Sequence, residues 1–200
     1  MACLRISSDK GSSGKTMLIF VNRFFFPDHS ATSQILSDLA FELARTGIEV
    51  EVITSRQIYD SPKAALQSLE VIDGVTVRRI WSTSFGRGSL VLRTVDYLTF
   101  YMSVWAVLLR ELRRGDVVVA KTDPPLLSLV AAMAAKLKKA HLVNWLQDLY
   151  PEVLDAFLGK ALRRLTPPIR WLRNCSLMNA DANVAIGERM RLHLISEGLS

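Results

Sequence analysis

The chain has 200 residues, of which 50% are hydrophobic and 22% are charged, and its formal net charge is +6. This composition suits a globular domain with a buried core and excludes a disordered or collagen-like chain. Two cysteines, Cys3 and Cys175, are too few for a disulfide framework or a four-thiolate zinc site. The longest uncharged apolar-rich run, residues 97–109, is shorter than the roughly 20 residues of a membrane-spanning helix, so no span is predicted.

The first sixteen residues are polar and rich in glycine and serine, without the apolar stretch of a secretory signal. Met17 stands directly before an apolar strand pattern. We therefore expect residues 1–16 to be a disordered leader, Met17 to be the natural start and residues 17–200 to fold. Residues 11–16 end like a phosphate-binding loop, but Asp9 occupies the first glycine position and the segment precedes a strand, which excludes that motif.

Apolar runs and helical spacings alternate along the rest of the chain. In order, the pattern predicts a strand at 16–22, a helix around 35–44, a strand at 48–54, a variable loop closing in a turn at 73–74, a strand at 75–80, a helix at 90–113, a strand at 116–121, a helix at 124–139, a strand at 141–146, a helix at 168–179, a strand at 182–186 and a helix at 188–197. Strands that alternate with crossover helices require a parallel sheet covered on both faces. The expected fold class is α/β, with a doubly wound, Rossmann-like parallel sheet.

Ligands of open parallel sheets bind beyond the carboxyl ends of the strands, so the loops after the strands are the candidate sites. The loop after the first strand leads into a helix N-terminus, which attracts phosphate or carboxylate. Ser30 or Thr32 could instead be a simple N-cap. A G-x-G-x-x-G sequence is missing, so a dinucleotide-dependent dehydrogenase is not supported. The candidate binding residues of this loop are Asp28, His29, Ser30, Thr32 and Ser33.

Two further loops end in carboxylates. Thr122 and Asp123 follow the strand at 116–121, where Asp123 is either a ligand or a helix cap. Asp148 follows the buried strand at 141–146 and could orient a hydroxyl group or act as a base. The three histidines have no paired ligand spacing, so no metal site is expected.

The positive charge is concentrated in one part of the chain. Residues 1–86 hold nine basic and nine acidic residues, so the whole excess lies in residues 87–200. A basic, apolar, tryptophan-bearing stretch there could lie on an anionic membrane surface. The alternative is a solvated helix that packs on the domain, since two prolines divide the stretch. No motif for nucleic-acid binding accompanies the charge, so nucleic acid is not an expected partner. The candidate membrane residues are Lys160, Arg163, Arg164, Arg170, Trp171 and Arg173.

Four blocks of sequence carry a resemblance to a known family. They are FFFPDHSATSQILSDLAFELARTGIEVEVIT, DVVVAKTDPPLLS, LVNWLQDLYPE and ADANVAIGERMRLHLISEGLS. Together they resemble the N-terminal half of family 4 glycosyltransferases with the two-domain GT-B architecture, particularly the bacterial members that build surface polysaccharides. The resemblance implies that this half binds the acceptor, that a C-terminal domain binds a nucleotide-sugar, and that transfer between them retains the anomeric configuration without a required metal.

Carried over to this sequence, the resemblance implies that the residues of the three loops line the acceptor site, with Asp148 as the catalytic candidate. Serines stand at 30 and 33 where family members often have glycine. The family pattern would continue beyond Ser200 into the donor domain. We therefore expect no cofactor other than the nucleotide-sugar co-substrate, bound mainly by that domain, and no activity of this chain alone.

The expected partners are a lipid-linked saccharide acceptor, a donor domain in cis or in trans, and an anionic membrane surface. The expected location is the cytoplasm, at the inner face of the plasma membrane. The alternative is a non-catalytic subunit that binds a small ligand or recruits a donor-binding chain to the membrane.

Overall fold

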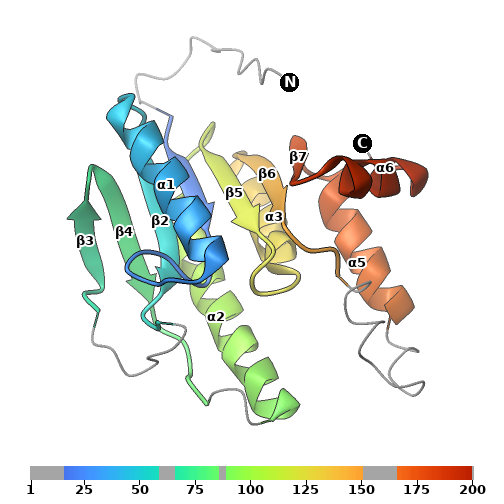
Figure 1. The fold of residues 1–200 in the computed structure, drawn as a ribbon, viewed down its shortest axis with the longest axis horizontal. Coiled ribbons are helices and arrows are strands. Elements are labelled where there is room, and N and C mark those ends of the chain that lie inside the picture. The colour runs from blue at the N-terminus through green and yellow to red at the C-terminus, as the bar shows by residue number, and fades with distance from the viewer. Residues whose placement is uncertain (1–15, 59–65, 86–88, 151–165, 200) are drawn as a thin grey trace.

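The computed structural model describes residues 16–58, 66–85, 89–150 and 166–199. Almost all of the expected leader, residues 1–15, therefore lies outside the described residues. Strands and helices alternate through the described residues (Figure 1) as β1 (Leu18–Val21), α1 (Ala31–Arg45), β2 (Val50–Ser55), β3 (Leu69–Ile72), β4 (Val75–Ile80), α2 (Leu90–Glu111), β5 (Val117–Lys121), α3 (Leu127–Lys138), β6 (His141–Leu146), α5 (Thr166–Met178), β7 (Ala182–Ala185) and α6 (Glu188–Ser196).

The described strands form a seven-stranded sheet in the order β3-β4-β2-β1-β5-β6-β7. Neighbouring strands run parallel, except that β3 runs antiparallel to β4. At the centre, Leu18 of β1 pairs with Val50 of β2 on one side and with Val117 of β5 on the other. Both β2 and β5 are buried along their whole length, as parallel strands covered on both faces must be. The expected doubly wound α/β sheet is confirmed.

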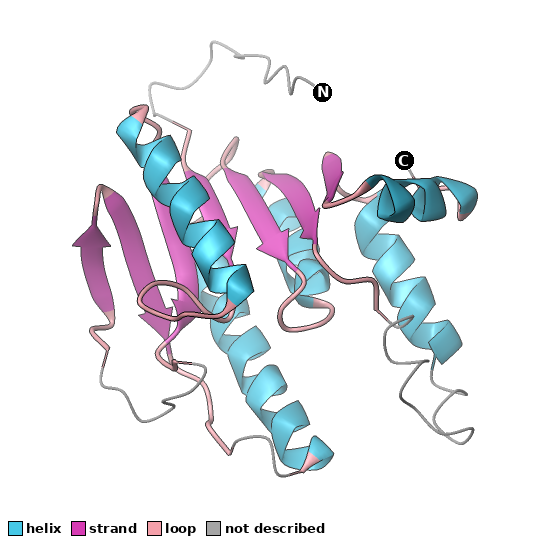
Figure 2. Ribbon diagram, in the orientation of Figure 1, coloured by secondary structure: helices cyan, strands magenta, loops and turns pink. Residues whose placement is uncertain are grey.

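Helices cover both faces of this sheet (Figure 2). On one face α1 packs through Leu36 and Ala40 against β1, β2, β4 and β5. On the other face α2 and α3 pack against the same central strands. A smaller cluster joins α5 and α6 to the end of β6 through Leu146, Leu177 and Leu194. Two separate apolar layers therefore hold the central strands in place.

The helix α2, with 22 residues, extends beyond the strands that it covers (Figure 1). Phe100, Val104 and Leu108 recur every four residues and are fully buried against the strands. The earlier part of the helix projects past the carboxyl ends of the strands (Figure 1). It thus forms a wall beside the edge at which ligands of such sheets bind. Exposed apolar side chains on this part are Val91, Leu92 and Leu98, and Met102 is exposed farther along the helix.

Two expected boundaries differ from the structure. The segment expected as a variable loop before residue 75 contains β3, a four-residue edge strand with an alternating pattern of exposure. Its sequence LEVI is short and carries a glutamate, so an apolar-run criterion misses it. The helix expected from residue 124 begins at Leu127, because Pro124 and Pro125 belong to the preceding loop. The other expected elements are present, with ends shifted by a few residues.

The turn expected at Asp73 and Gly74 joins β3 to β4, and both residues have positive φ angles, 47° and 84°. This is the geometry for which Asp-Gly is favoured in two-residue hairpins. We expect Gly74→Ala to lower the free energy of unfolding by about 1 kcal/mol, because a side chain is strained at this φ. The new Cβ would lie 3.5 Å from the Cβ of Ala44, which is ordinary contact, so strain and not a clash sets the cost.

Urea unfolding measures this change. Gly187→Ala is the matched control, because Gly187 has an extended backbone and open space where a Cβ would stand. Equal losses in the two variants would contradict the prediction.

Candidate functional site

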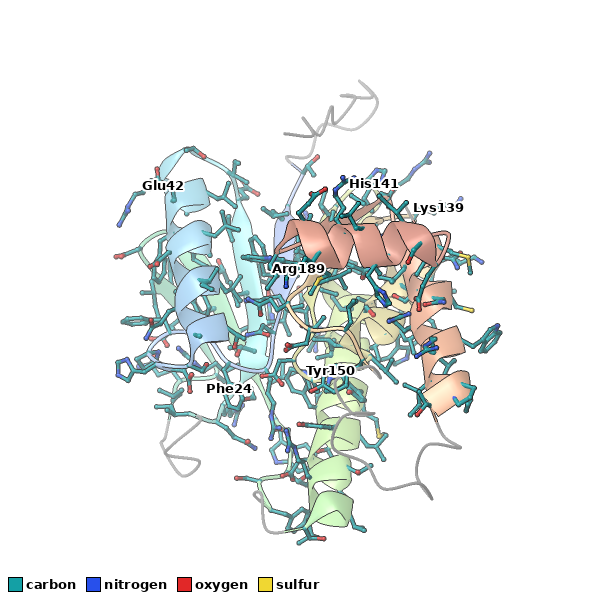
Figure 3. All side chains as sticks on the ribbon, turned by 45° about the vertical axis from the view of Figure 1, so that its right-hand side comes forward. Phe24, Glu42, Lys139, His141, Tyr150 and Arg189 are labelled. Atoms are coloured by element: carbon teal, nitrogen blue, oxygen red, sulfur yellow. The ribbon has the colours of Figure 1, made fainter. Side chains whose placement is uncertain are left out.

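The site lies where the winding of the sheet reverses. From β1 the chain crosses to β2 on one side, whereas β5 continues to β6 on the other, so the loops after β1 and β5 diverge. A backbone hydrogen bond from Arg23 N to Asp123 O, 3.1 Å, joins the two loops. Figure 3 shows Phe24 and Tyr150 at this edge of the sheet and Glu42 and His141 at the opposite edge. The carboxyl ends of β1, β5 and β6 therefore meet in one place.

Arg23 is fixed at this edge by its backbone and its side chain. Its carbonyl accepts hydrogen bonds from Ser55 N and Thr54 Oγ1, each 3.0 Å. Its guanidinium donates to Gln57 Oε1 at 3.2 Å. The same group lies 5.1 Å from the ring centroid of Tyr97. Arg23 thus links the ends of β1 and β2 to the wall formed by α2.

The wall contributes three side chains spaced by four residues, so they share one helix face. Arg93 Nε donates to Tyr97 Oη at 2.6 Å, and its guanidinium lies 5.4 Å from the Tyr97 ring centroid. The Tyr101 hydroxyl donates a hydrogen bond to the carbonyl of Pro125. This contact attaches α2 to the loop after β5.

Asp123 is the carboxylate at the centre of these groups. Burial raises the pKa of its carboxyl, against the opposing effects of Arg23, Arg93 and Lys121, while the negative charge of Asp148 raises it further. Asp123 is partly exposed, yet the effect of desolvation on its pKa exceeds the opposing effect of the three nearby cations. A carboxyl with a raised pKa is better suited to accept a proton than an ordinary one.

Asp148 lies at the end of β6, as expected, and is exposed. It lines a small cavity together with Lys121, Thr122 and Tyr150. Thr122 Oγ1 accepts a hydrogen bond from Gln147 N at 3.3 Å, which ties the loop after β5 to the loop after β6. Burial, followed by the charge of Asp148, raises the pKa of the Tyr150 hydroxyl. The structure therefore brings Thr122, Asp123 and Asp148 together.

The loop after β1 turns into α1 beside them. Asp28 is buried, and its Oδ1 accepts a hydrogen bond from Ser30 N at 2.8 Å. Ser30 occupies the N-cap position, but its side chain makes no capping bond. The hydroxyls of Ser30 and Ser33 are both buried without a hydrogen-bond partner. The alternative expectation, that the Ser30 side chain caps the helix, is therefore wrong.

The remaining two residues of the loop have different surroundings. His29 is exposed, and its carbonyl accepts a hydrogen bond from Gln34 Nε2 at 2.9 Å. The carbonyl of Thr32 accepts one from Lys121 Nζ at 2.6 Å. Thr32 is thus connected to the end of β5, whereas no hydrogen bond joins the side chain of His29 to the described residues of the site.

The expected membrane residues are only partly described. Lys160, Arg163 and Arg164 lie outside the described residues. On α5, Arg170 is partly buried, and Trp171 is 65% exposed. Arg173 is buried and forms an ion pair with Glu197 at 2.5 Å, so its assignment to a membrane surface is wrong. Among the helices of the described residues, none combines the length and the apolar character that a membrane span requires.

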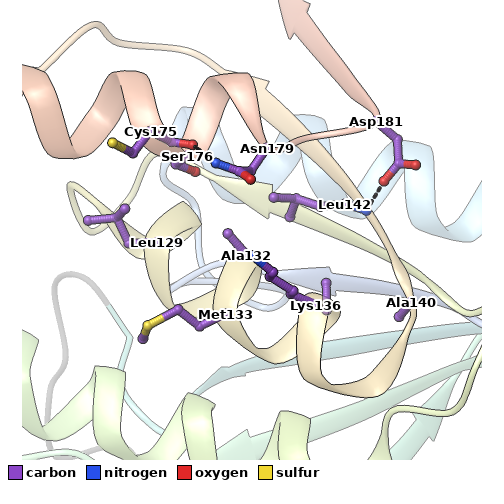
Figure 4. Close-up of a pocket in the computed structure, with 11 residues that line it drawn as sticks. Leu129, Ala132, Met133, Lys136, Ala140, Leu142, Cys175, Ser176, Asn179 and Asp181 are labelled. Atoms are coloured by element: carbon purple, nitrogen blue, oxygen red, sulfur yellow. Dashed lines mark hydrogen bonds between the residues drawn. The ribbon is translucent and has the colours of Figure 1, made fainter.

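A larger groove of about 420 Å³ lies between α3 and α5 (Figure 4). It is lined by Met133, Lys136 and Cys175 among others, and by Asp181, whose carboxylate accepts a hydrogen bond from Leu142 N at 2.8 Å. None of the candidate loop residues borders it. Across the described residues, no group of three or more histidine, cysteine or acidic side chains is placed to hold a metal ion.

Sequence reasoning missed the arginine and tyrosine side chains of the site. Arg23 directly follows the first strand, which was a usable signal. The spacing of Arg93, Tyr97 and Tyr101 was visible too, but a helix pattern does not reveal that its first turns extend beyond the sheet. Tyr150 lies two residues after Asp148 in the same loop, so its position after the strand is a usable signal as well.

Comparisons with known proteins agree on the fold. A family model described as a glycosyl transferase 4-like domain matches residues 31–200. No curated protein matches the sequence. The solved sucrose-phosphate synthase from Thermosynechococcus elongatus has a TM-score of 0.65 at 11% identity, covering 91% of this chain and 45% of the synthase. An α,α-trehalose 6-phosphate synthase from Burkholderia multivorans has a TM-score of 0.56 at 14% identity, covering 92% and 43%. The chain thus spans less than half the length of either structure.

Proposed function

The chain belongs to the glycosyl transferase 4-like family, and we propose that it forms the acceptor-binding half of a sugar-transfer site. Its fold is that of one half of the GT-B architecture. The observation that carries the proposal is the meeting of Asp123 and Asp148 with arginine and tyrosine side chains at the point where the sheet reverses its winding. Saccharides are recognised by such groups, because carboxylates and guanidiniums satisfy several hydroxyls while tyrosine rings pack against the sugar.

The proposed reaction transfers a hexosyl group from a nucleotide-sugar with retention of configuration. The bond between the anomeric carbon and the donor diphosphate breaks, and a bond to the acceptor hydroxyl oxygen forms. The nucleoside diphosphate leaves, and the hydroxyl proton passes to a base or to the departing phosphate. In this chain Asp148 is the proposed catalytic residue, and its carboxylate accepts a hydrogen bond from the acceptor hydroxyl. Asp123 is the second carboxylate beside it, and its raised pKa suits proton acceptance.

Binding of the nucleotide-sugar is assigned to a separate donor-binding domain. This domain is either part of the same protein chain or supplied by another chain. Catalysis of this kind depends on positioning and on stabilising the departing phosphate charge. The groups that would hold the nucleotide are proposed to lie mainly outside this chain. We therefore propose that the chain alone binds acceptor without turning it over and needs no metal or further cofactor.

The proposed acceptor is a lipid-linked saccharide of polysaccharide biosynthesis, bound at the cytoplasmic face of the plasma membrane. Support comes from the exposed apolar residues of α2, where Val91 on the projecting part and Met102 farther along the helix are more than 70% exposed. They lie on the same helix as Arg93 and Tyr97 of the site. An amphiphile could therefore place its saccharide against the carboxylates and its chain along α2.

Calorimetric titration with lipid-linked saccharides tests the acceptor assignment. We expect Asp148→Asn and Asp123→Asn each to weaken saccharide binding about tenfold, because each removes a charge-assisted hydrogen bond. Asp38→Asn, an exposed change on α1, is the matched control and should leave binding unchanged. Tight binding of a nucleotide-sugar by the chain alone would contradict the proposed division between the two halves.

Vesicle flotation tests the membrane assignment. We expect the chain to float with vesicles that contain anionic lipid, and Met102→Glu to reduce recovery severalfold by placing a negative charge on the apolar face. Val71→Glu on the edge strand β3 is the control, because Val71 is equally exposed, at 70% against 71% for Met102. Equal recovery of the chain with neutral and with anionic vesicles would show that electrostatic attraction does not contribute to membrane binding. Flotation without any saccharide binding would favour the recruiting subunit instead of the acceptor site.

A further inference from the structure

Two guanidinium groups from different parts of the chain share one aromatic ring at the edge of the site. Arg23, from the loop after β1, lies 5.1 Å from the Tyr97 ring centroid, and Arg93, from α2, lies 5.4 Å from it. Arg93 also donates from Nε to Tyr97 Oη at 2.6 Å. The ring and the hydroxyl of Tyr97 therefore help to position the two cations, and each guanidinium keeps N–H groups that make no hydrogen bond within the described residues.

These two cations are not neutralised by a direct ion pair. Within the described residues, no carboxylate forms a salt bridge with Arg23 or Arg93. The Nε of Arg23 is buried and has no hydrogen-bond partner. Arg23 donates its Nη2 only to the neutral amide oxygen of Gln57. Two like charges are therefore held at one ring, an arrangement that an anion would stabilise.

The nearby carboxylates balance these cations only in part. Asp123 interacts electrostatically with both arginines but forms no ion pair with either, and burial raises the pKa of its carboxyl. Lys121 adds a third cation to the same cluster. Among the described residues, the three cations Arg23, Arg93 and Lys121 thus outnumber the carboxylates Asp123 and Asp148 in this cluster, and two of the three come from the loop after β1 and from α2.

We propose that Arg23 and Arg93 form, around Tyr97, an anion subsite that binds a phosphoryl group of the acceptor. This inference rests on the proposed function and names the chemistry of its substrate. The planar guanidinium donates two parallel hydrogen bonds, which match the oxygens of a phosphate or diphosphate.

The position of the subsite favours the acceptor over the donor. The carboxylates that would bind the acceptor hydroxyl lie on one side of it, at the ends of β5 and β6. The exposed apolar residues Val91 and Leu92 precede Arg93 in the first turn of α2, the part of the helix that projects farthest past the carboxyl ends of the strands (Figure 1). This order, saccharide, then phosphate, then apolar chain, is that of a sugar joined through a phosphate to a lipid.

The test is calorimetric titration of the full chain with four probes. Geranyl diphosphate presents a diphosphate on an apolar chain, and a hexose 6-phosphate presents a phosphate on a sugar. The unphosphorylated hexose and uridine diphosphate are the comparison probes. Arg93→Gln is the main variant, since Arg93 is exposed and its replacement leaves the core untouched. Arg114→Gln is the matched control, because it removes an exposed arginine at the opposite edge of the sheet, between α2 and β5.

We expect Arg93→Gln to weaken binding of geranyl diphosphate or hexose 6-phosphate about tenfold, with Arg114→Gln unchanged. Arg93→Lys should recover part of the loss, because it restores the charge without the bidentate geometry. A stronger response to geranyl diphosphate identifies a lipid-linked phosphate, and a stronger response to hexose 6-phosphate identifies a sugar phosphate; either result supports the subsite.

Two results would overturn it. Equal affinities of Arg93→Gln and Arg114→Gln for both phosphorylated probes would remove the subsite. A loss confined to uridine diphosphate would assign the arginines to the donor. Failure of the proposed function looks different: saccharide binding by the carboxylates would be missing while the arginine-dependent phosphate binding persisted. Saccharide binding without any dependence on Arg93 would leave the proposed function intact and reject only the subsite.

Discussion

Replacing Arg79 with methionine is expected to lower the free energy of unfolding by about 3 kcal/mol, because it removes one member of a buried polar network. Arg79 lies on β4, and its side chain is 1% exposed. It forms an ion pair with Glu70 on β3 and donates to the carbonyl of Gln67 at 3.3 Å. It also donates from Nη2 to the carbonyl of Phe26 at 2.8 Å. One side chain therefore connects the edge strand and the loop after β1 to the sheet.

Urea unfolding at neutral pH measures this loss, and Arg45→Met is the matched control. Arg45 pairs with Glu42 at 3.4 Å on the surface of α1, with both side chains more than 60% exposed, so its loss should cost well under 1 kcal/mol. Similar costs for the two arginines would show that the Arg79 network contributes little.

The same variant has a consequence for the site. The carbonyl of Phe26 stands two residues before Asp28, at the start of the candidate loop. When Arg79 no longer holds it, the loop should lose order, and saccharide binding should weaken although Arg79 touches no ligand. Binding measured under conditions where the variant is fully folded separates this effect from global unfolding.

Most of the fold could be predicted because its signals are local. Strands such as β5, with the sequence VVVAK, are buried on both faces and appear as short apolar runs between charged residues. The edge strand β3 could not be found in this way. Its stability depends on Val71 and Glu70 pairing with Thr76 and Val77 of β4 and on the contact between Glu70 and Arg79, none of which is visible in a four-residue pattern.

The candidate site also contains some residues that local sequence signals predict and others that they do not. Thr122, Asp123 and Asp148 could be predicted because parallel strands end at one edge of the sheet, and loop position then follows from strand order. The contributions of Arg93 and Tyr97 could not, since they depend on how far α2 extends past that edge. Arg173 shows the converse error: its basic, apolar neighbourhood suggested an exposed surface, but Glu197, distant in sequence, pairs with it in a buried position.

Lys121 gives the second large prediction, a pH dependence of stability. The residue is 1% exposed, its Nζ lies 4.5 Å from the Trp145 ring centroid, and it donates to the carbonyl of Thr32. Burial lowers the pKa of the Lys121 ammonium from 10.5 to about 8, with the charge of Asp123 opposing the change. The folded chain therefore releases this proton at lower pH than the unfolded chain does.

The direction of this pH dependence follows from the number of protons that each state binds. Between pH 8 and pH 10.5 the unfolded chain holds more protons at this residue than the folded chain, so the contribution of Lys121 to the free energy of unfolding rises with pH. Below pH 8 both states are protonated, and the cost of burying the charge is fully present. At 1.36 kcal/mol for each pH unit, the whole change amounts to about 3 kcal/mol.

The measurement is the difference in unfolding free energy between the unmodified chain and Lys121→Met, taken by urea unfolding at pH 7 and again near pH 10.5. Other groups whose protonation differs between the folded and the unfolded chain in this range are common to both proteins and cancel in the difference; Tyr101, whose pKa is raised by burial in the folded chain, is one of them. We expect the difference to move by about 3 kcal/mol in favour of the unmodified chain as the pH rises. Lys136→Met removes an exposed lysine from α3 and is the matched control. A difference that stays constant with pH would mean that the ammonium of Lys121 remains hydrated, and that the end of β5 is more open to water than its burial between Trp145 and Thr32 implies.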